Sequence, residues 1–125
     1  MYTRILLKLS GEQLQGQYDG GFDIERAQWI AGQLKPLQEA GKQIVIMVGG
    51  GNYARGAQLA SEQIHRVTAD NIGMLATVMN GLALASVLNA EGVDTRVLSS
   101  IAADQVVDQF THRRAASHLD KGRVV

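Results

Sequence analysis

The feature that most constrains the fold is a run of five consecutive apolar residues at 44–48, which ends in Gly-Gly-Gly-Asn at 49–52. A strand with one face in water alternates apolar and polar residues. This run does not alternate, so it predicts a strand buried on both faces, as in a parallel sheet. The glycines predict a tight turn at the carboxyl end of that strand. We therefore expect an α/β fold around this segment.

Strands and helices are predicted to alternate along the rest of the chain, which indicates a parallel sheet with right-handed crossovers. Further strands are expected at 5–9, at 95–98 and from 122 onward, and helices at 24–37, 53–61, 70–90 and 111–119, with a loop or small hairpin at 12–21. Asp23 and Gly41 are the expected caps of the helix at 24–37, and Pro36 is expected to kink or shorten it. The last strand is either an edge strand or the start of a strand in a longer natural protein, and we favour the longer protein.

The helix at 70–90 is apolar around most of its circumference and carries small residues such as Ala76, Gly81 and Ala85. Such a helix is buried, either within its own chain or by a partner subunit.

Composition excludes several classes of function. The 125 residues suffice for about one domain, and 46% hydrophobic and 19% charged residues are typical of a soluble globular protein. Twelve basic residues balance twelve acidic ones, so no broad charge favours nucleic acid or a membrane surface. The chain has no cysteine, its three histidines lack metal-ligand spacing, and we predict no metal site. The apolar run near the N-terminus is too short for a signal peptide or membrane span, which favours the cytoplasm.

Two glycine turns are candidate phosphate sites: Ser10-Gly11 and 49–52. Ligands of open parallel sheets bind beyond the carboxyl ends of the strands, and glycine lets phosphate oxygens approach backbone N–H groups. The same turns could simply join strands to helices. Lys8 and Arg55 are nearby cations that suit either a phosphate or the solvent. Asp70 is either a helix cap or an acceptor for a ligand hydroxyl. Neither a Walker motif nor a spaced Gly-x-Gly-x-x-Gly is present.

Three segments match a known family in order along nearly the whole chain. They are RILLKLSGE at 4–12, VGGGN with a following Arg-Gly at 48–56, and GMLATVMNGLA at 73–83. The chain resembles the N-terminal part of bacterial-type UMP kinases within the amino acid kinase superfamily. The first two segments are shared across that superfamily, and the third points to UMP kinases.

The resemblance implies an α/β/α sandwich, a homohexamer, ATP with Mg²⁺ as donor and UMP as acceptor. It assigns Lys8, as the catalytic cation, together with Ser10 and Gly11, to the phosphates of ATP. It assigns Gly49, Gly50 and Arg55 to the UMP phosphate and Asp70 to the ribose. It also implies that the helix at 72–90 helps to form a dimer interface.

The sequence departs from the family in places. Ala69-Asp70-Asn71-Ile72 replaces the usual Gly-Asp-His-Met, and 52–55 reads Asn-Tyr-Ala-Arg rather than Asn-Leu-Phe-Arg. Of three residues that accompany a GTP response in the family, only Arg96 is kept, because Ala85 and Asn89 occupy the other two positions. This argues against activation by GTP and leaves Arg96 as a remnant of an effector site.

The family's adenine-binding segments would lie beyond residue 125, so we interpret 1–125 as a single partial domain, the acceptor half of the fold. Two alternatives stay open. One is another amino acid kinase that acts on a carboxylate or carbamate. The other is a non-catalytic half-domain that assembles through residues 72–90.

Overall fold

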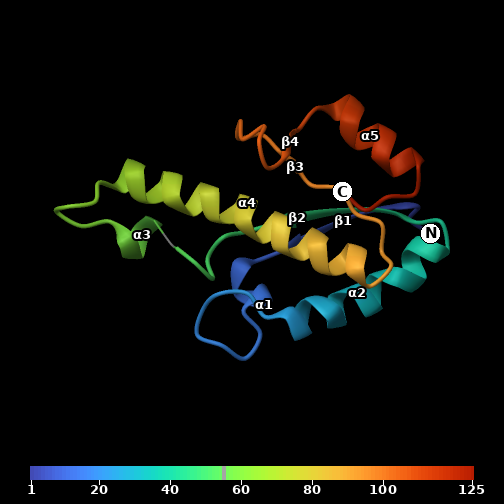
Figure 1. Ribbon diagram of the computed structural model, residues 1–125, viewed down its shortest axis with the longest axis horizontal. Helices are drawn as coiled ribbons and strands as arrows, with labels where there is room; N and C mark the ends of the chain where they lie inside the picture. The colour runs from blue at the N-terminus through green and yellow to red at the C-terminus, as the bar shows by residue number, and fades with distance from the viewer. Residues whose placement is uncertain (55) are drawn as a thin grey trace.

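The computed structural model describes residues 1–54 and 56–125 as an α/β fold (Figure 1). The strands are β1 (Arg4–Leu9), β2 (Gln43–Val48), β3 (Leu98–Ser99) and β4 (Asp108–Gln109). The helices are α1 (Gly11–Leu14), α2 (Ile24–Glu39), α3 (Gly56–Leu59), α4 (Arg66–Ala90) and α5 (His112–Asp120).

The strand pairs are parallel, as predicted. β1 pairs with β2 from Arg4–Gln43 to Leu9–Val48, and β3 pairs with β4. The final residues 124–125 lie between β2 and the segment 94–96. On one side Val125 N–H donates to Ile44 O at 3.1 Å and Val125 O accepts from Ile46 N–H at 2.7 Å. On the other side Val124 is bonded in the same way to residues 94 and 96, at 2.9 and 2.8 Å. Of the two positions that the sequence left open for this strand, the edge position is excluded, because the strand is bonded on both sides.

The main core lies on one face of the sheet, beneath α2 and α4. Strand residues of that face and the apolar sides of both helices form one cluster, whose buried members include Leu9, Leu14, Ala27, Ile30, Ala31, Leu34, Ile44, Leu84, Leu88, Val93 and Val124. Helix α5 contacts β2 and lies on the side of the sheet away from α2 (Figure 1). The predicted α/β/α layering is confirmed.

The second face of β1 and β2 is not buried, contrary to the prediction from the apolar run. Met47 is 56% exposed and Leu6 64% exposed. Alternate residues of a strand point to opposite faces, and α5 contacts β2 on this side through Gln43 and Asp120. The run is therefore buried on one face and largely open on the other.

The ends of α2 follow the sequence prediction. The Asp23 side chain accepts a hydrogen bond from Glu25 N–H at 2.9 Å, and Gly41 adopts a φ of +82° just after the helix. The helix is not shortened by Pro36, which lies in the last turn and removes a single backbone donor there. Asp23 and Gly41 thus fix the length of the helix.

Other boundaries differ from the prediction. The segment after β1 contains the four-residue helix α1 rather than only a loop, and Ser10 N–H donates to Gln13 Oε1 at 2.8 Å at its start. The stretch predicted as helical at 53–61 narrows to α3. In the strand predicted at 95–98, Thr95 forms a single bridge to Val124 before β3 begins.

Helix α4 begins at Arg66, four residues before its predicted start, and only one of its sides is buried in this chain. Its buried residues are Ala69, Ala76, Asn80, Leu84, Ala85 and Leu88. Other apolar residues are exposed: Ile72 at 38%, Leu75 at 53% and Met79 at 50%. By length and composition alone this helix could cross a membrane, a test that core helices of soluble proteins also pass.

Candidate functional site

The two predicted glycine turns lie against each other at the carboxyl ends of β1 and β2. Gly49 N–H donates to Leu9 O at 2.9 Å, which holds the turns side by side. A Cβ atom added to Gly11 would lie 2.4 Å from Gly51 N and 2.7 Å from Asn52 N. No side chain fits in that space, so glycine at 11 is required by the contact between the turns.

The second turn also packs tightly on helix α4. A Cβ atom added to Gly50 would lie 2.7 Å from Gly73 O and 2.8 Å from Ala76 Cβ. Gly50 and the small Ala76 therefore allow the backbone of the turn to approach the helix closely. A Cβ atom added to Gly51 would lie 2.7 Å from Glu12 Oε1. The Glu12 side chain, which belongs to α1, therefore borders the same turn.

Two buried amides fix the position of the second turn. Asn80 of α4 donates from Nδ2 to Gly49 O at 2.7 Å and to Asn52 Oδ1 at 2.6 Å. Asn52 donates from Nδ2 to Asn80 Oδ1 at 3.0 Å and to Gly21 O at 2.8 Å. Neither asparagine is among the site residues expected from the sequence, although Asn52 ends the candidate turn at 49–52. The available signal was Asn80, an amide in the middle of an apolar helix, since such a group needs hydrogen-bonding partners when it is buried.

The structure places Lys8 in solvent, on the open face of β1 and opposite Met47 of β2. It lies near the carboxyl end of β1, two residues before Ser10, which is also exposed. The accessible Lys8 ammonium is compatible with both interpretations that the sequence left open, a solvated lysine and a phosphate ligand. Arg55 lies outside the described residues.

Asp70 does not cap α4, because the helix begins a full turn earlier. Its carboxylate accepts a hydrogen bond from Arg66 Nε at 3.0 Å, and both side chains are at least half exposed. Asp70 lies one helical turn before Gly73, whose carbonyl adjoins Gly50. The structure therefore puts Asp70 on the helix against which the second turn packs, with its carboxylate accessible.

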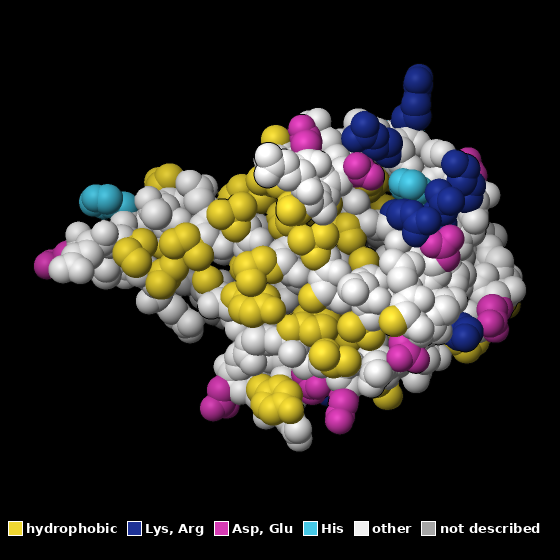
Figure 2. Space-filling model, viewed as in Figure 1, with side chains coloured by type: hydrophobic (Ala, Val, Ile, Leu, Met, Phe, Trp, Pro, Cys, Tyr) yellow, Lys and Arg dark blue, Asp and Glu magenta, His cyan; other side chains and the backbone are white. Residues whose placement is uncertain are grey.

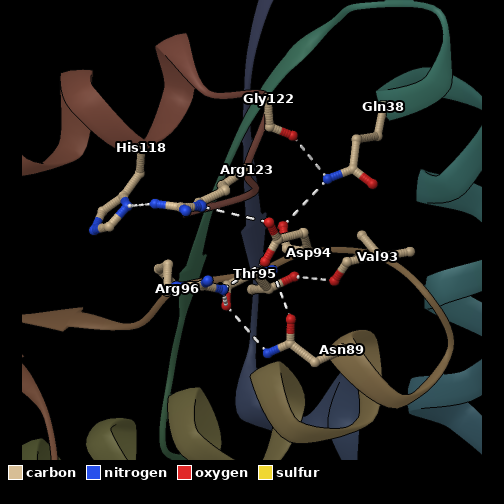
Figure 3. Close-up of polar contacts among 9 residues, drawn as sticks. All are labelled: Gln38, Asn89, Val93, Asp94, Thr95, Arg96, His118, Gly122 and Arg123. Carbon is tan, nitrogen blue, oxygen red and sulfur yellow. Dashed lines mark hydrogen bonds and ion pairs between the residues drawn. The ribbon is translucent and has the colours of Figure 1, made fainter.

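Arg96 belongs to a separate polar cluster (Figure 3). It forms an ion pair with Asp94 and donates to Thr95 O at 2.9 Å, and Arg123 lies 3.4 Å from the other oxygen of Asp94. Asn89 holds Thr95 through Thr95 N–H to Oδ1 at 2.8 Å and Nδ2 to Thr95 O at 3.1 Å. These contacts join the end of α4 to the sheet and do not involve the glycine turns.

His118 of α5 adjoins this cluster, with its Nδ1 atom 3.1 Å from Arg123 Nη1. Burial lowers the pKa of His118 below its ordinary value of 6.5. The nearby cations Arg123, Arg96 and Lys121 lower this pKa further, against an opposing effect of Asp108. The imidazole is consequently held in its neutral form over a wider pH range.

No group of three or more histidine, cysteine, aspartate or glutamate side chains gathers within the described ranges 1–54 and 56–125.

Comparison with known proteins covers nearly the entire chain. The model of the amino acid kinase family matches residues 3–125. The uridylate kinase of Dichelobacter nodosus is 48% identical over 124 residues, covering 99% of this chain and 52% of that protein. The uridylate kinase of Methylococcus capsulatus is 47% identical over 125 residues, again covering 52% of its length. The chain thus spans about half the length of the curated relatives that it matches.

Solved structures agree with the fold. The UMP kinase of Bacillus anthracis superposes with a TM-score of 0.90 at 38% identity, over 99% of this chain and 51% of that one. The carbamate kinase of Giardia lamblia, solved with bound AMP-PNP, gives a TM-score of 0.53 at 14% identity and supports the fold alone.

Proposed function

The chain belongs to the amino acid kinase family, and on that premise we propose that it provides the acceptor half of an enzyme that transfers a phosphoryl group from ATP to UMP. The observation that carries the proposal is the contact between the two glycine turns, where a Cβ atom on Gly11 would lie 2.4 Å from Gly51 N. Two phosphate-binding turns in contact would bring donor and acceptor phosphates together, and alignment contributes much of the rate in such a reaction.

The proposed roles follow the two turns. Lys8, Ser10 and Gly11 would face the phosphates of ATP, with the Lys8 ammonium stabilising charge on the transferred group. Gly49, Gly50 and Arg55 would hold the UMP phosphate, and Asp70 would accept a hydrogen bond from the ribose. The exposure of Lys8 and Asp70 supports these roles, because both side chains are accessible to a ligand.

The chemistry needs few side chains. The second pKa of a phosphate monoester is about 6, so UMP is already largely a dianion at neutral pH and requires no general base. Mg²⁺ would arrive with ATP and neutralise charge between the two polyanions. The residues of this chain would orient the acceptor and add positive charge at the point of transfer.

The proposal extends to assembly and location. The exposed apolar residues Ile72, Leu75 and Met79 on α4 support self-association through 72–90, with a homohexamer as the expected assembly. Figure 2 shows apolar side chains gathered along α4. The cytoplasm is the expected compartment.

The test is a calorimetric titration of the 125-residue chain with UMP, with CMP as the matched control. We expect saturable binding of UMP that weakens on Arg55→Ala, and little response to CMP. If neither nucleotide binds, the acceptor site does not exist in this chain and the non-catalytic half-domain is the correct interpretation. Titration with carbamate and with a small carboxylate distinguishes another amino acid kinase, which would bind one of these in place of UMP.

A further inference from the structure

The peptide between Gly49 and Gly50 is intrinsically easy to rotate. Neither glycine has a Cβ atom that restricts the backbone, so the peptide plane between them can turn over with little steric cost. Such a rotation would reverse the directions of Gly49 O and Gly50 N–H. A turn that binds an anion through backbone N–H groups therefore needs a contact that keeps this peptide in one orientation.

The structure holds this peptide through its carbonyl oxygen. Gly49 N–H donates to Leu9 O at 2.9 Å, and Gly49 O accepts from Asn80 Nδ2 at 2.7 Å. The Gly49–Gly50 peptide is trans and planar, so its C=O and N–H bonds point in opposite directions. Because Asn80 draws the carbonyl oxygen toward α4, Gly50 N–H is directed away from that helix.

The Asn80 amide has a single orientation that satisfies its partners. Its two N–H groups donate to Gly49 O and to Asn52 Oδ1, and its oxygen accepts from Asn52 Nδ2 at 3.0 Å. The second N–H group of Asn52 donates to Gly21 O at 2.8 Å. Turning the Asn80 amide over would bring its oxygen against Gly49 O, two acceptors without a hydrogen between them. The pair therefore keeps a donor in front of Gly49 O.

The Gly50 N–H group has no acceptor of its own among residues 1–54 and 56–125, although Gly50 is buried. Buried backbone N–H groups are nearly always paired, so this donor calls for a partner. The carbonyl oxygen of the same residue is already engaged, since it accepts from Tyr53 and Ala54 N–H at 3.0 and 3.1 Å. A bound anion on the side away from α4 would supply the acceptor that Gly50 N–H lacks.

We propose that Asn80 is a positioning residue for the acceptor phosphate, because it holds Gly49 O and thereby directs Gly50 N–H toward a phosphate oxygen of UMP. This role rests on the proposed function, in which Gly50 contacts that phosphate. The Asn80 side chain is fully buried and acts through the peptide, without touching the nucleotide. A leucine in its place would fill a similar volume but would leave the peptide between the two glycines able to rotate.

The first experiment follows the Gly50 amide proton by NMR while the 125-residue chain is titrated with UMP. We expect a downfield shift at saturation, because the N–H group gains a charged acceptor. Uridine, which lacks the phosphate, should produce no such shift. Saturable binding of UMP that leaves the Gly50 proton unmoved would overturn the positioning role alone. Absence of UMP binding by the wild-type chain would overturn the proposed function as well, so the two failures are distinguishable.

The second experiment compares two buried positions of α4. Asn80→Leu should raise the Kd for UMP by about tenfold and reduce the Gly50 shift at saturation, because the peptide is no longer held. The matched control is Leu88→Ala, which opens a cavity in the core and lowers stability without contact to Gly49. It should keep the wild-type Kd and shift. An unchanged Kd in Asn80→Leu, or an equal loss of affinity in both variants, would overturn the proposal.

A third variant, Asn80→Asp, keeps the test decisive if Asn80→Leu does not fold. A protonated carboxyl retains one donor for Gly49 O, whereas a carboxylate has none. We therefore expect the UMP affinity of this variant to recover toward the wild-type value as the pH falls and the new carboxyl is protonated. Comparison with wild type at each pH cancels the titration of the UMP phosphate itself. A ratio of the two affinities that does not change with pH would contradict the role assigned to Asn80.

Discussion

Asn52 and Asn80 each donate from Nδ2 to the Oδ1 of the other, at 3.0 and 2.6 Å. Both side chains are buried, and each has one further bond, to Gly21 O and to Gly49 O. The pair joins the second glycine turn to the middle of α4 and to the loop that precedes α2. The position of a candidate phosphate-binding turn is thus set by a reciprocal amide contact inside the fold.

The first prediction removes one half of this pair. Asn80→Leu leaves the Asn52 amide and Gly49 O without their partner in a buried place, and we expect a loss of about 2–4 kcal/mol in the free energy of unfolding. Urea denaturation measures the loss. The matched control is Asn71→Leu, at an exposed position of the same helix, which should change stability by less than about 0.5 kcal/mol. Equal effects at the two positions would contradict the assigned role of the pair.

The second prediction compares two glycines. Gly11→Ala puts a methyl group against the backbone of the second turn, and we expect it to cost about 1–3 kcal/mol and to weaken UMP binding. Gly32→Ala lies in α2 where a Cβ atom would meet nothing within 4 Å, so it should stabilise the chain by about 0.5–1 kcal/mol. Thermal unfolding of both variants tests the pair. A Gly11→Ala variant as stable as wild type would show that the turns can separate freely.

The third prediction concerns the pH dependence of stability. The pKa of His118 lies below 6.5 in the folded chain, so between that value and 6.5 the unfolded chain binds the proton more strongly. The contribution of neutral His118 to stability is complete above pH 6.5 and is lost as pH falls through this window. His118→Gln should remove that loss, measured as the urea midpoint against pH. His112→Gln, at the exposed start of the same helix, retains His118 and should retain the wild-type slope.

The fourth prediction tests the exposed apolar stripe of α4, formed by Ile72, Leu75 and Met79. Leu75→Glu combined with Met79→Glu puts two charges one turn apart on this stripe, and we expect the chain to become monomeric in sedimentation velocity. Val67→Glu places a charge at a 73% exposed position nearer the start of the helix, off the stripe, and should leave assembly unchanged. A wild-type chain that is monomeric at all concentrations would refute the predicted self-association.

Much of the fold could be predicted from local pattern, because apolar runs and helical spacing identify strands and long helices within a single segment. The strand at 44–48 and the cap at Asp23 are of this kind. The start of α4 was misplaced because Asp70 is a good cap residue, whereas His65 at the actual start makes no side-chain cap bond. The exposed face of β2 also could not be predicted, since burial depends on which elements reach the strand.

The candidate site was predictable only in part, for a similar reason. Glycine turns after strands are visible in the sequence, and the structure brings Gly11, Gly49 and Gly50 together. The Asn52–Asn80 contact joins residues 28 positions apart, and no local pattern pairs them. Local sequence, the run of glycines, forms the turn. Tertiary contacts such as Asn52–Asn80 fix its position.

The fifth prediction separates two roles of Asp70, its ion pair with Arg66 and its proposed contact with the ribose. Its ion pair with Arg66 is largely exposed, so breaking it should cost less than about 0.5 kcal/mol in the free energy of unfolding. If Asp70 also contacts the ribose, Asp70→Asn should weaken UMP binding by roughly tenfold, since a charge-assisted hydrogen bond becomes a neutral one. Arg66→Met breaks the same ion pair but leaves the carboxylate in place, and calorimetry should show UMP binding close to wild type. Equal loss of affinity in the two variants would mean that the ion pair, and not the carboxylate's own contact, is what UMP binding requires.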